Sequence, residues 1–157
     1  MIHRGSVMVH AVAAVCAVVL LVAVPAAAAT VQPPAVFATV LDVAAWQAAV
    51  ANKVAYAPPD FTQLHFIHCS TNNQTAWVLN RFYGANTTAL TAVIETAELT
   101  SPVAMVHSVP GMAPFPHIMG KLNLEAVPKV LTLTRPSLSQ PWNHAAVCAS
   151  LGGCADK

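Results

Sequence analysis

The chain has 157 residues, of which 56% are hydrophobic and 8% are charged, and its formal net charge is +1. Soluble domains carry about 25% charged residues, so solubility here depends on uncharged polar side chains. The hydrophobic content excludes intrinsic disorder, the length fits one domain, and the lack of any Lys/Arg excess or cluster argues against a nucleic acid partner.

Residues 1–29 have the pattern of an export signal. The polar start contains Arg4, residues 7–24 are almost wholly apolar, and Pro25 is followed by four alanines. A charged start, an apolar core and a small-residue cleavage site are the parts of a secretory signal. The sequence therefore predicts a protein that is secreted or held in the secretory-pathway lumen. The alternative is an uncleaved leader that anchors the chain to a membrane through residues 7–29.

Cleavage would remove Arg4 and leave six positive and six negative side chains, a formal net charge of zero. The sequence then divides into a spacer at 30–35, an α+β domain at 36–134 and a C-terminal tail at 135–157. About half of this mature chain is apolar, which is enough for one packed core.

The first elements of the domain are a strand and a helix. Residues 36–41 are rich in β-forming side chains and predict the strand. Asp42 is then a helix N-cap, because its carboxylate can accept a hydrogen bond from a free backbone amide. The apolar positions of this helix, which runs to Asn52, are Val43, Trp46 and Val50, and their spacing predicts that they form its buried face.

The later elements alternate less regularly. In chain order we expect a loop at 56–61, a strand at 66–68, a helix from Ser70 or Thr71 to Tyr83 that Gly84 ends in the left-handed conformation, strands at 90–95 and 103–107, a loop at 108–116, brief pairing at 117–119, one helical turn at 123–127 and a last strand at 130–134. This order predicts an α+β domain with two main helices.

Two features agree with export. Asn73 and Asn86 each begin an Asn-x-Thr glycosylation pattern; the alternative is that they are plain polar loop residues. Cys148 and Cys154 enclose a short segment with two glycines, and we expect them to form a disulfide. Cys69 lies in an apolar run and is expected to be a buried thiol. The sequence has no Cys-x-x-Cys pair, so no metal site is predicted.

Histidine is the main candidate for chemistry. His68 lies at a strand end just before a helix, where backbone amides favour anions. His117 follows Pro116, which fixes its direction as an acid–base or binding role requires. Either histidine could instead be structural, and a three-imidazole metal site with His65 is a third alternative. His107 and His144 have the setting of ordinary surface residues.

Three ordered motifs carry a resemblance to a known family. They are Phe-Ile-His-Cys-Ser-Thr at 66–71, Asn-Arg-Phe-Tyr-Gly at 80–84, and Phe-Pro-His-Ile-Met-Gly-Lys-Leu-Asn-Leu-Glu-Ala-Val at 115–127. Together they resemble family 952 of the domains of unknown function over roughly residues 36–134. The chain departs from the family pattern at Ala38, where many members have His or Lys, and at His65, Met119 and Lys121, where Gly, Tyr and Pro are usual.

The resemblance implies a compact fold similar to the ADP-ribosyltransferase domain, with split, crossing β-sheets and an NAD cleft. It implies that His68 and Ser70 contact ribose, that Arg81 meets phosphate, and that His117 lines the other side of the cleft as the candidate catalytic residue. NAD would then be a substrate, and an enzyme would transfer or cleave its ADP-ribosyl group. The alternative is a catalytically silent binding or structural domain of the secretory pathway.

Overall fold

The computed structural model describes residues 31–154. The expected signal segment and the last three residues lie outside this part. Within 31–154, no helix has both the length and the apolar content needed to span a membrane.

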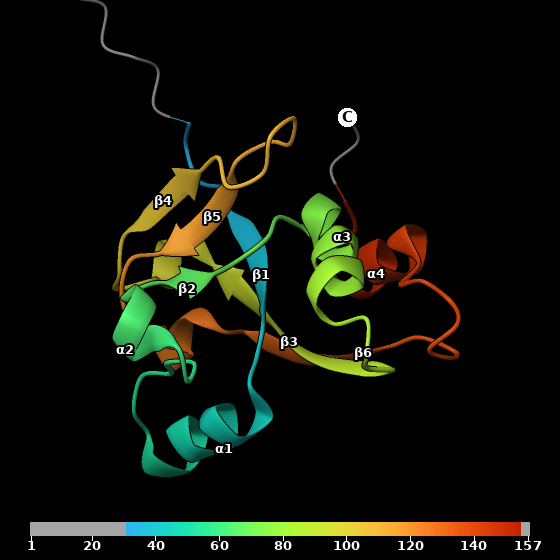
Figure 1. Cartoon of the computed structure of the whole chain (residues 1–157). Helices are drawn as coiled ribbons and strands as arrows, with labels where there is room; N and C mark the ends of the chain where they lie inside the picture. The colour runs from blue at the N-terminus through green and yellow to red at the C-terminus, as the bar shows by residue number, and fades with distance from the viewer. Residues whose placement is uncertain (1–30, 155–157) are drawn as a thin grey trace, which may run out of the picture. The chain divides into compact units, whose positions relative to one another are not determined.

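Two antiparallel sheets of three strands form the framework (Figure 1). The first sheet has the order β1 (Val36–Val40), β3 (Thr88–Glu95), β6 (Lys129–Thr134). The second has the order β2 (Ile67–His68), β5 (Phe115–Ile118), β4 (Val103–Val106). Backbone hydrogen bonds of 2.8 and 2.9 Å between Ala38 and Ser70 join the two sheets. The expectation of a split sheet in an α+β domain is therefore confirmed.

The helices are α1 (Val43–Asn52), the single turn α2 (Phe61–Leu64), α3 (Asn72–Phe82) and α4 (His144–Ser150), with 3₁₀ turns η1 (Thr96–Glu98) and η2 (Leu124–Ala126). The expectation of two main helices is wrong, because α4 is a third. Its seven residues are mostly small, so they show no helical periodicity in the sequence.

The first sheet is covered on both faces, because side chains alternate along each strand. One face contributes Phe37, Ala92 and Ile94 to a core cluster with Ile67 and Ile118 of the second sheet and Ala49 of α1. The other face contributes Ala38, Val93 and Leu133 to a cluster with Leu79 of α3 and Trp142 and Val147 near and in α4. Figure 1 shows the second sheet and the α3–α4 pair on opposite sides of β1 and β3.

Helix α1 begins as expected, but only part of its expected apolar face is buried. The Asp42 carboxylate accepts a hydrogen bond of 2.8 Å from the Ala45 amide, which confirms the N-cap. Trp46 is partly buried against the first core cluster, as expected, but Val43 and Val50 are 51% and 48% exposed, and Ala49 is the buried residue. Alanine allows the helix backbone to approach the core closely, so the larger valines point to solvent.

Helix α3 is capped by Thr71, which is one of the two residues expected to do so. Gln74 completes a capping box with it. Its end differs from the expectation, because Gly84 does not have a positive φ. The Tyr83 amide donates to the Leu79 carbonyl at 2.9 Å, and the Gly84 carbonyl accepts from the Arg135 guanidinium. The Arg135 side chain therefore holds the connection that follows α3, and no left-handed glycine ends the helix.

Strand β5 begins two residues before the expected pairing segment and includes Pro116. Pro116 has no amide proton and would normally break a central strand. It is tolerated because Pro116 lies opposite Cys69, one residue past the end of β2, so the missing amide proton falls at the end of the ladder with β2 and not within it. The Pro116 carbonyl still accepts a hydrogen bond of 3.0 Å from the Cys69 amide.

The segment expected as a tail is part of the core. Trp142 is 2% exposed, and Val147 and Leu151 are also buried among residues of α3 and the first sheet. The predicted disulfide between Cys148 and Cys154 is present, and Cys69 is a buried free thiol as expected. The disulfide thus holds the end of a segment that packs on α3.

Candidate functional site

The candidate site is built on a pair of histidines that face each other across two strands. His68 of β2 and His117 of β5 are direct partners in the antiparallel register. Directly opposed residues of a sheet present their side chains on the same face. The two rings lie 4.9 Å apart between centroids and meet edge to face. The local register therefore brings together two residues that are 49 positions apart in the sequence.

Phe66 completes a three-ring cluster with these histidines. Because it lies two residues before His68, it shares that residue's side of the chain. Its ring stacks on His117 at 4.6 Å and 7°, and meets His68 edge to face at 4.8 Å. This stacking fixes the direction of the His117 ring.

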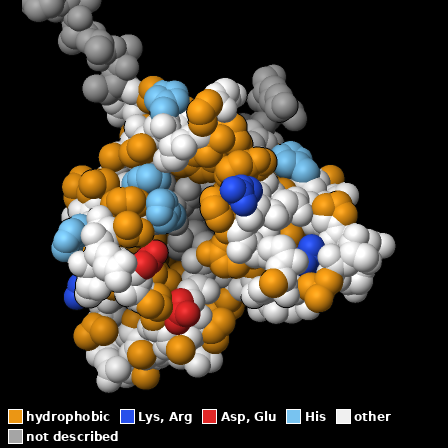
Figure 2. Space-filling model, viewed as in Figure 1, with side chains coloured by type: hydrophobic (Ala, Val, Ile, Leu, Met, Phe, Trp, Pro, Cys, Tyr) orange, Lys and Arg blue, Asp and Glu red, His pale blue; other side chains and the backbone are white. Residues whose placement is uncertain are grey.

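A pocket of about 400 Å³ opens beside the pair, between β1, β2, β5 and α3. Small-molecule sites commonly have volumes of about 300–1,000 Å³. Its aromatic lining residues are Tyr56, Trp77, Phe82, Tyr83 and Phe115. Among the described residues that line it, Asp60 is the only acid and there is no Lys or Arg. Figure 2 shows histidine side chains gathered beside a hollow on this face.

Ser70 lies in the pocket wall and is 2% exposed. Its hydroxyl lies 2.9 Å from the Thr75 hydroxyl, and Thr75 donates its own proton to the Thr71 carbonyl at 3.0 Å. Since a hydroxyl has a single proton, Ser70 must donate to Thr75. Its lone pairs remain to accept a hydrogen bond, which suits a ligand that presents a hydroxyl group.

Burial sets the protonation of His117, which is 5% exposed. Desolvation, followed by the charge of nearby His68, lowers the pKa of His117 below its ordinary value of 6.5. At neutral pH the ring is therefore uncharged, with one nitrogen as donor and the other as acceptor. A neutral imidazole can take up a proton, as a general base must.

This lowered pKa predicts a pH dependence of stability. Between the folded-state pKa of His117 and about 6.5, the unfolded chain binds more protons than the folded chain. The contribution of neutral His117 to the free energy of unfolding is therefore complete above about pH 6.5, and it is lost as the pH falls through the folded-state pKa. We expect the wild type to lose stability relative to His117→Gln as the pH is lowered from 7.5 to 5. Urea denaturation of both proteins measures this difference.

The exposed residue His107, replaced in the same way, serves as the control. A difference between wild type and His117→Gln that stays constant over this pH range, or changes in the opposite direction, would contradict the assigned direction of the pKa change.

Two other titratable groups in the wall stay protonated at neutral pH. Burial raises the pKa of the Cys69 thiol to about 12, so Cys69 is not a thiolate nucleophile. Burial also raises the pKa of Tyr56 to about 12, while its oxygen accepts from the Asp42 amide at 3.0 Å. Chemistry in this pocket therefore falls to the histidines and the Asp60 carboxylate, with hydroxyl groups as polar contacts.

Arg81, which the family resemblance implies as a phosphate contact, is exposed and does not line the pocket. Its guanidinium carbon lies 5.5 Å from the ring centroid of Phe82, whose side chain does line the pocket. A phosphate group could meet Arg81 only at the rim.

The structure does not support the three-imidazole alternative. His65 ends α2 in the left-handed conformation, with φ 60°, and is exposed. Among the described residues, the ligand atoms of His65, His68 and His117 do not form a metal-sized group. The left-handed backbone gives a reason for the glycine that the family pattern has at this position, because glycine adopts positive φ without strain.

The two glycosylation patterns lie in different settings. Asn86 is exposed in the connection between α3 and β3. Asn73 lies in the first turn of α3, and the Thr75 of its pattern is fully buried. Asn86 is therefore the more accessible of the two in the folded chain.

Tyr56 and Asp60 are pocket residues that the sequence interpretation missed. Both belong to the Pro58-Pro59 connection, which reads only as a loop. The Tyr56 backbone pairs with Leu122, with hydrogen bonds of 2.8 and 3.0 Å, and this bridge turns the connection toward the pocket. No local signal in the sequence reports such a long-range bridge.

The fold and the site thus define a small α+β domain with a histidine-paired pocket. The chain belongs to the family described as "Protein of unknown function (DUF952)", which it matches over residues 40–130, more than half of its length. The resemblance to that family is therefore confirmed.

Two solved structures are similar to this chain: protein CC0527 from Caulobacter crescentus and a double mutant of it. Each has a TM-score of 0.58 and 20% sequence identity, and the match covers 68% of this chain and 92% of that chain. At this identity the likeness concerns the fold alone. No curated protein matches the chain.

Proposed function

We propose that the pocket binds NAD or a closely related nucleotide, and that the domain acts as an ADP-ribosyltransferase-like or NAD-cleaving enzyme. The observation that carries this proposal is the paired register of His68 and His117, which brings two imidazoles to one pocket of about 400 Å³. The fold similar to that of ADP-ribosyltransferases, implied by the family resemblance, belongs to the same proposal.

The chemistry of the lining supports a ligand with a cationic aromatic ring. Trp77 and Tyr83 offer aromatic faces, and cations bind favourably over such faces. Asp60 adds the one carboxylate of the lining. Nicotinamide linked to ribose is a planar cation and fits these groups. The ribose hydroxyls would meet Ser70 and the histidines, and the phosphates would extend toward Arg81 at the rim.

The reaction proposed is cleavage of the bond between nicotinamide and ribose. Nicotinamide leaves with the bonding electron pair, and the ribosyl carbon develops positive charge before an acceptor oxygen attacks it. Neutral His117 would take the proton from that acceptor, which is water or a hydroxyl group. With water, the products are nicotinamide, ADP-ribose and one proton. Such a centre depends on positioning and charge stabilisation more than on a strong nucleophile.

We also propose that the protein acts outside the cytosol, as the leader predicts. The disulfide between Cys148 and Cys154 supports this part of the proposal, because disulfides persist mainly in oxidising compartments.

A second candidate function is a catalytically silent binding or structural domain. The stacking of Phe66 on His117 at 4.6 Å favours it, because this contact gives the histidine a packing role without any ligand. The two candidates predict different effects of replacing His117. The enzyme would lose NAD binding and cleavage, whereas the structural domain would lose stability alone.

Calorimetric titration of the purified chain with NAD, up to millimolar concentration, tests the proposal. We expect saturable binding that His68→Ala and His117→Ala each weaken by about 10-fold or more, the loss of one to two hydrogen bonds. His107→Ala, at an exposed histidine outside the pocket, should bind as the wild type does. Chromatography of the mixtures should show nicotinamide release that His117→Ala abolishes.

Absence of heat at millimolar NAD would overturn the proposal. Binding that survives both substitutions would place the site elsewhere. If the substitutions lower the melting temperature while NAD neither binds nor is cleaved by any variant, the structural candidate is correct. Binding without nicotinamide release would show that the domain binds NAD without cleaving it, and would overturn the proposed enzymatic activity.

A further inference from the structure

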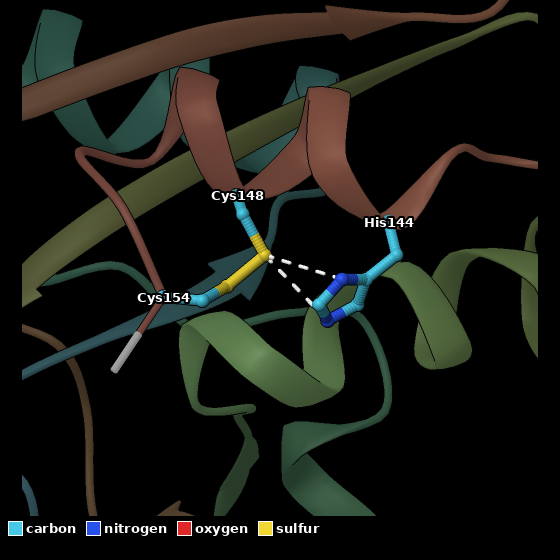
Figure 3. A group of neighbouring side chains, drawn as sticks. All are labelled: His144, Cys148 and Cys154. Atoms are coloured by element: carbon cyan, nitrogen blue, oxygen red, sulfur yellow. Dashed lines mark hydrogen bonds between the residues drawn. A yellow bond between two sulfur atoms is a disulfide. The ribbon is translucent and has the colours of Figure 1, made fainter. Parts of the chain in front are cut away.

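A second cluster of reactive side chains lies in and beside α4, outside the pocket. His144 precedes Cys148 by four residues, so the two side chains share one face of the helix. The Cys148 sulfur lies 3.7 Å from Nδ1 and 3.6 Å from Nε2 of His144 (Figure 3). Cys154 joins them through the disulfide, and the potential ligand atoms of all three lie within 4.8 Å of one another. None of the three lines the pocket.

We propose that reduction of this disulfide creates a site for a thiophilic divalent metal ion, Zn²⁺ in particular. The ligands are the thiolates of Cys148 and Cys154 and the imidazole of His144, with water in the fourth position. Two thiolates and an imidazole are a donor set that Zn²⁺ prefers, and three protein ligands plus water make a tetrahedral open site. The three residues do not have the spacing of a zinc motif in the sequence. Helix α4 and the turn that follows it bring them together.

The distances agree with such a site. Zn–S bonds of about 2.3 Å and Zn–N bonds of about 2.0 Å, at tetrahedral angles, put nitrogen and sulfur about 3.5 Å apart. The observed separation of His144 Nε2 and Cys148 Sγ is 3.6 Å. His144 is exposed, so its ring is free to turn one nitrogen toward the metal.

The second sulfur must move, since two thiolates on one zinc ion lie about 3.8 Å apart by the same geometry. The chain before Cys154 allows this movement. Gly152 and Gly153 have φ of 93° and 106°, and a Cβ built on either would meet nothing within 4 Å. The side-chain positions of this turn therefore face open space, although the Gly153 carbonyl accepts a hydrogen bond of 2.8 Å from the Asn72 side chain. The movement thus falls to Cys154, which follows that contact, whereas Cys148 is buried and stays on its helix.

The chemical step balances with a dithiol as the reductant. The dithiol gives two electrons and two protons to the disulfide and becomes a disulfide itself, leaving Cys148 and Cys154 as thiols. Binding of the metal ion then releases one proton from each thiol. In the oxidised chain the sulfurs are bonded to each other and cannot act as thiolate ligands. The redox state of the chain thus decides whether the site exists.

Cobalt titration of the full chain tests the proposal. The chain is reduced with a phosphine, which has no thiol to compete for metal, and Co²⁺ is added under anaerobic conditions. We expect one equivalent of Co²⁺ to bind, with a thiolate-to-cobalt charge-transfer band and the visible bands of tetrahedral cobalt. The oxidised chain should give neither band, and Zn²⁺ should displace the cobalt.

Variants assign the ligands. His144→Ala should weaken cobalt binding by about 10-fold or more, since even outer partners of metal ligands have effects of this size. His107→Ala, at another exposed histidine, should leave it unchanged. Cys148→Ser with Cys154→Ser should abolish the charge-transfer band. This double variant keeps Cys16 and Cys69, so a band that survives in it would assign the metal to those thiols and overturn the proposal.

Two further results would also overturn it: no charge-transfer band in the reduced wild type, or equal affinity in the wild type and His144→Ala. Circular dichroism of the double variant shows whether the fold survives without the disulfide. If the reduced wild type is unfolded and Co²⁺ does not restore its dichroism, the site does not form and the proposal fails. If Co²⁺ raises the melting temperature of the reduced chain, binding to the folded form is confirmed independently of the absorption bands.

Discussion

Replacement of Trp142 by alanine is expected to lower the free energy of unfolding by about 3–5 kcal/mol, the usual loss for a buried tryptophan. Trp142 is 2% exposed and lies in the core cluster with Leu79 and Val147. Its backbone is held by Asn80, which accepts from the Trp142 amide at 2.8 Å and donates to its carbonyl at 3.0 Å. Since small domains have about 5–15 kcal/mol of stability, this loss would be a large share of the total.

Urea denaturation followed by circular dichroism measures this effect, with the disulfide intact in both proteins. Leu138→Ala is the matched control, because Leu138 belongs to the same segment but is 59% exposed. We expect that variant to change stability by less than about 0.5 kcal/mol. If Trp142→Ala costs less than about 1 kcal/mol, the C-terminal segment is not part of the cooperative core.

Local signals in the sequence predicted much of the fold. β1 and β6 are runs of β-forming residues, and the Asp42 carboxylate identifies the start of α1 without any tertiary information. The errors occur where tertiary contacts decide. Val43 and Val50 have helical spacing, yet alanine is the residue that α1 buries. α4 is short and rich in small residues, so its packing on α3 leaves no periodic pattern in the sequence.

The candidate site was predictable as residue types but not as an arrangement. His68 and His117 are conspicuous because a helix start and a proline lie beside them. Their convergence depends on the register of β2 with β5, which is a pairing between distant segments. Tyr56 reaches the pocket through a bridge to Leu122 for the same kind of reason. His144 reads as a surface histidine, and only the helix brings its ring to the disulfide.

Replacement of Arg135 by leucine is expected to lower the free energy of unfolding by about 3 kcal/mol. The Arg135 guanidinium donates to the carbonyls of Asn86 and Gln140, each at 2.8 Å, and also to the carbonyl of Gly84. Hydrogen bonds to charged groups contribute about 1.5–3 kcal/mol each, and effects within one network do not add fully. Arg135 is 8% exposed, so water can only partly replace the lost guanidinium as the donor to these carbonyls.

Arg81→Leu is the matched control for Arg135→Leu, because each guanidinium lies over an aromatic ring at a similar distance. Arg81 is 5.5 Å from the Phe82 centroid, and Arg135 is 5.4 Å from the Trp142 centroid. Arg81 is exposed, so its loss should cost less than about 1 kcal/mol. The excess for Arg135 in urea denaturation then measures the three carbonyl contacts. Equal losses in the two variants would show that the ring contacts, and not the hydrogen bonds of Arg135 to the connection after α3 and to the C-terminal segment, stabilise the fold.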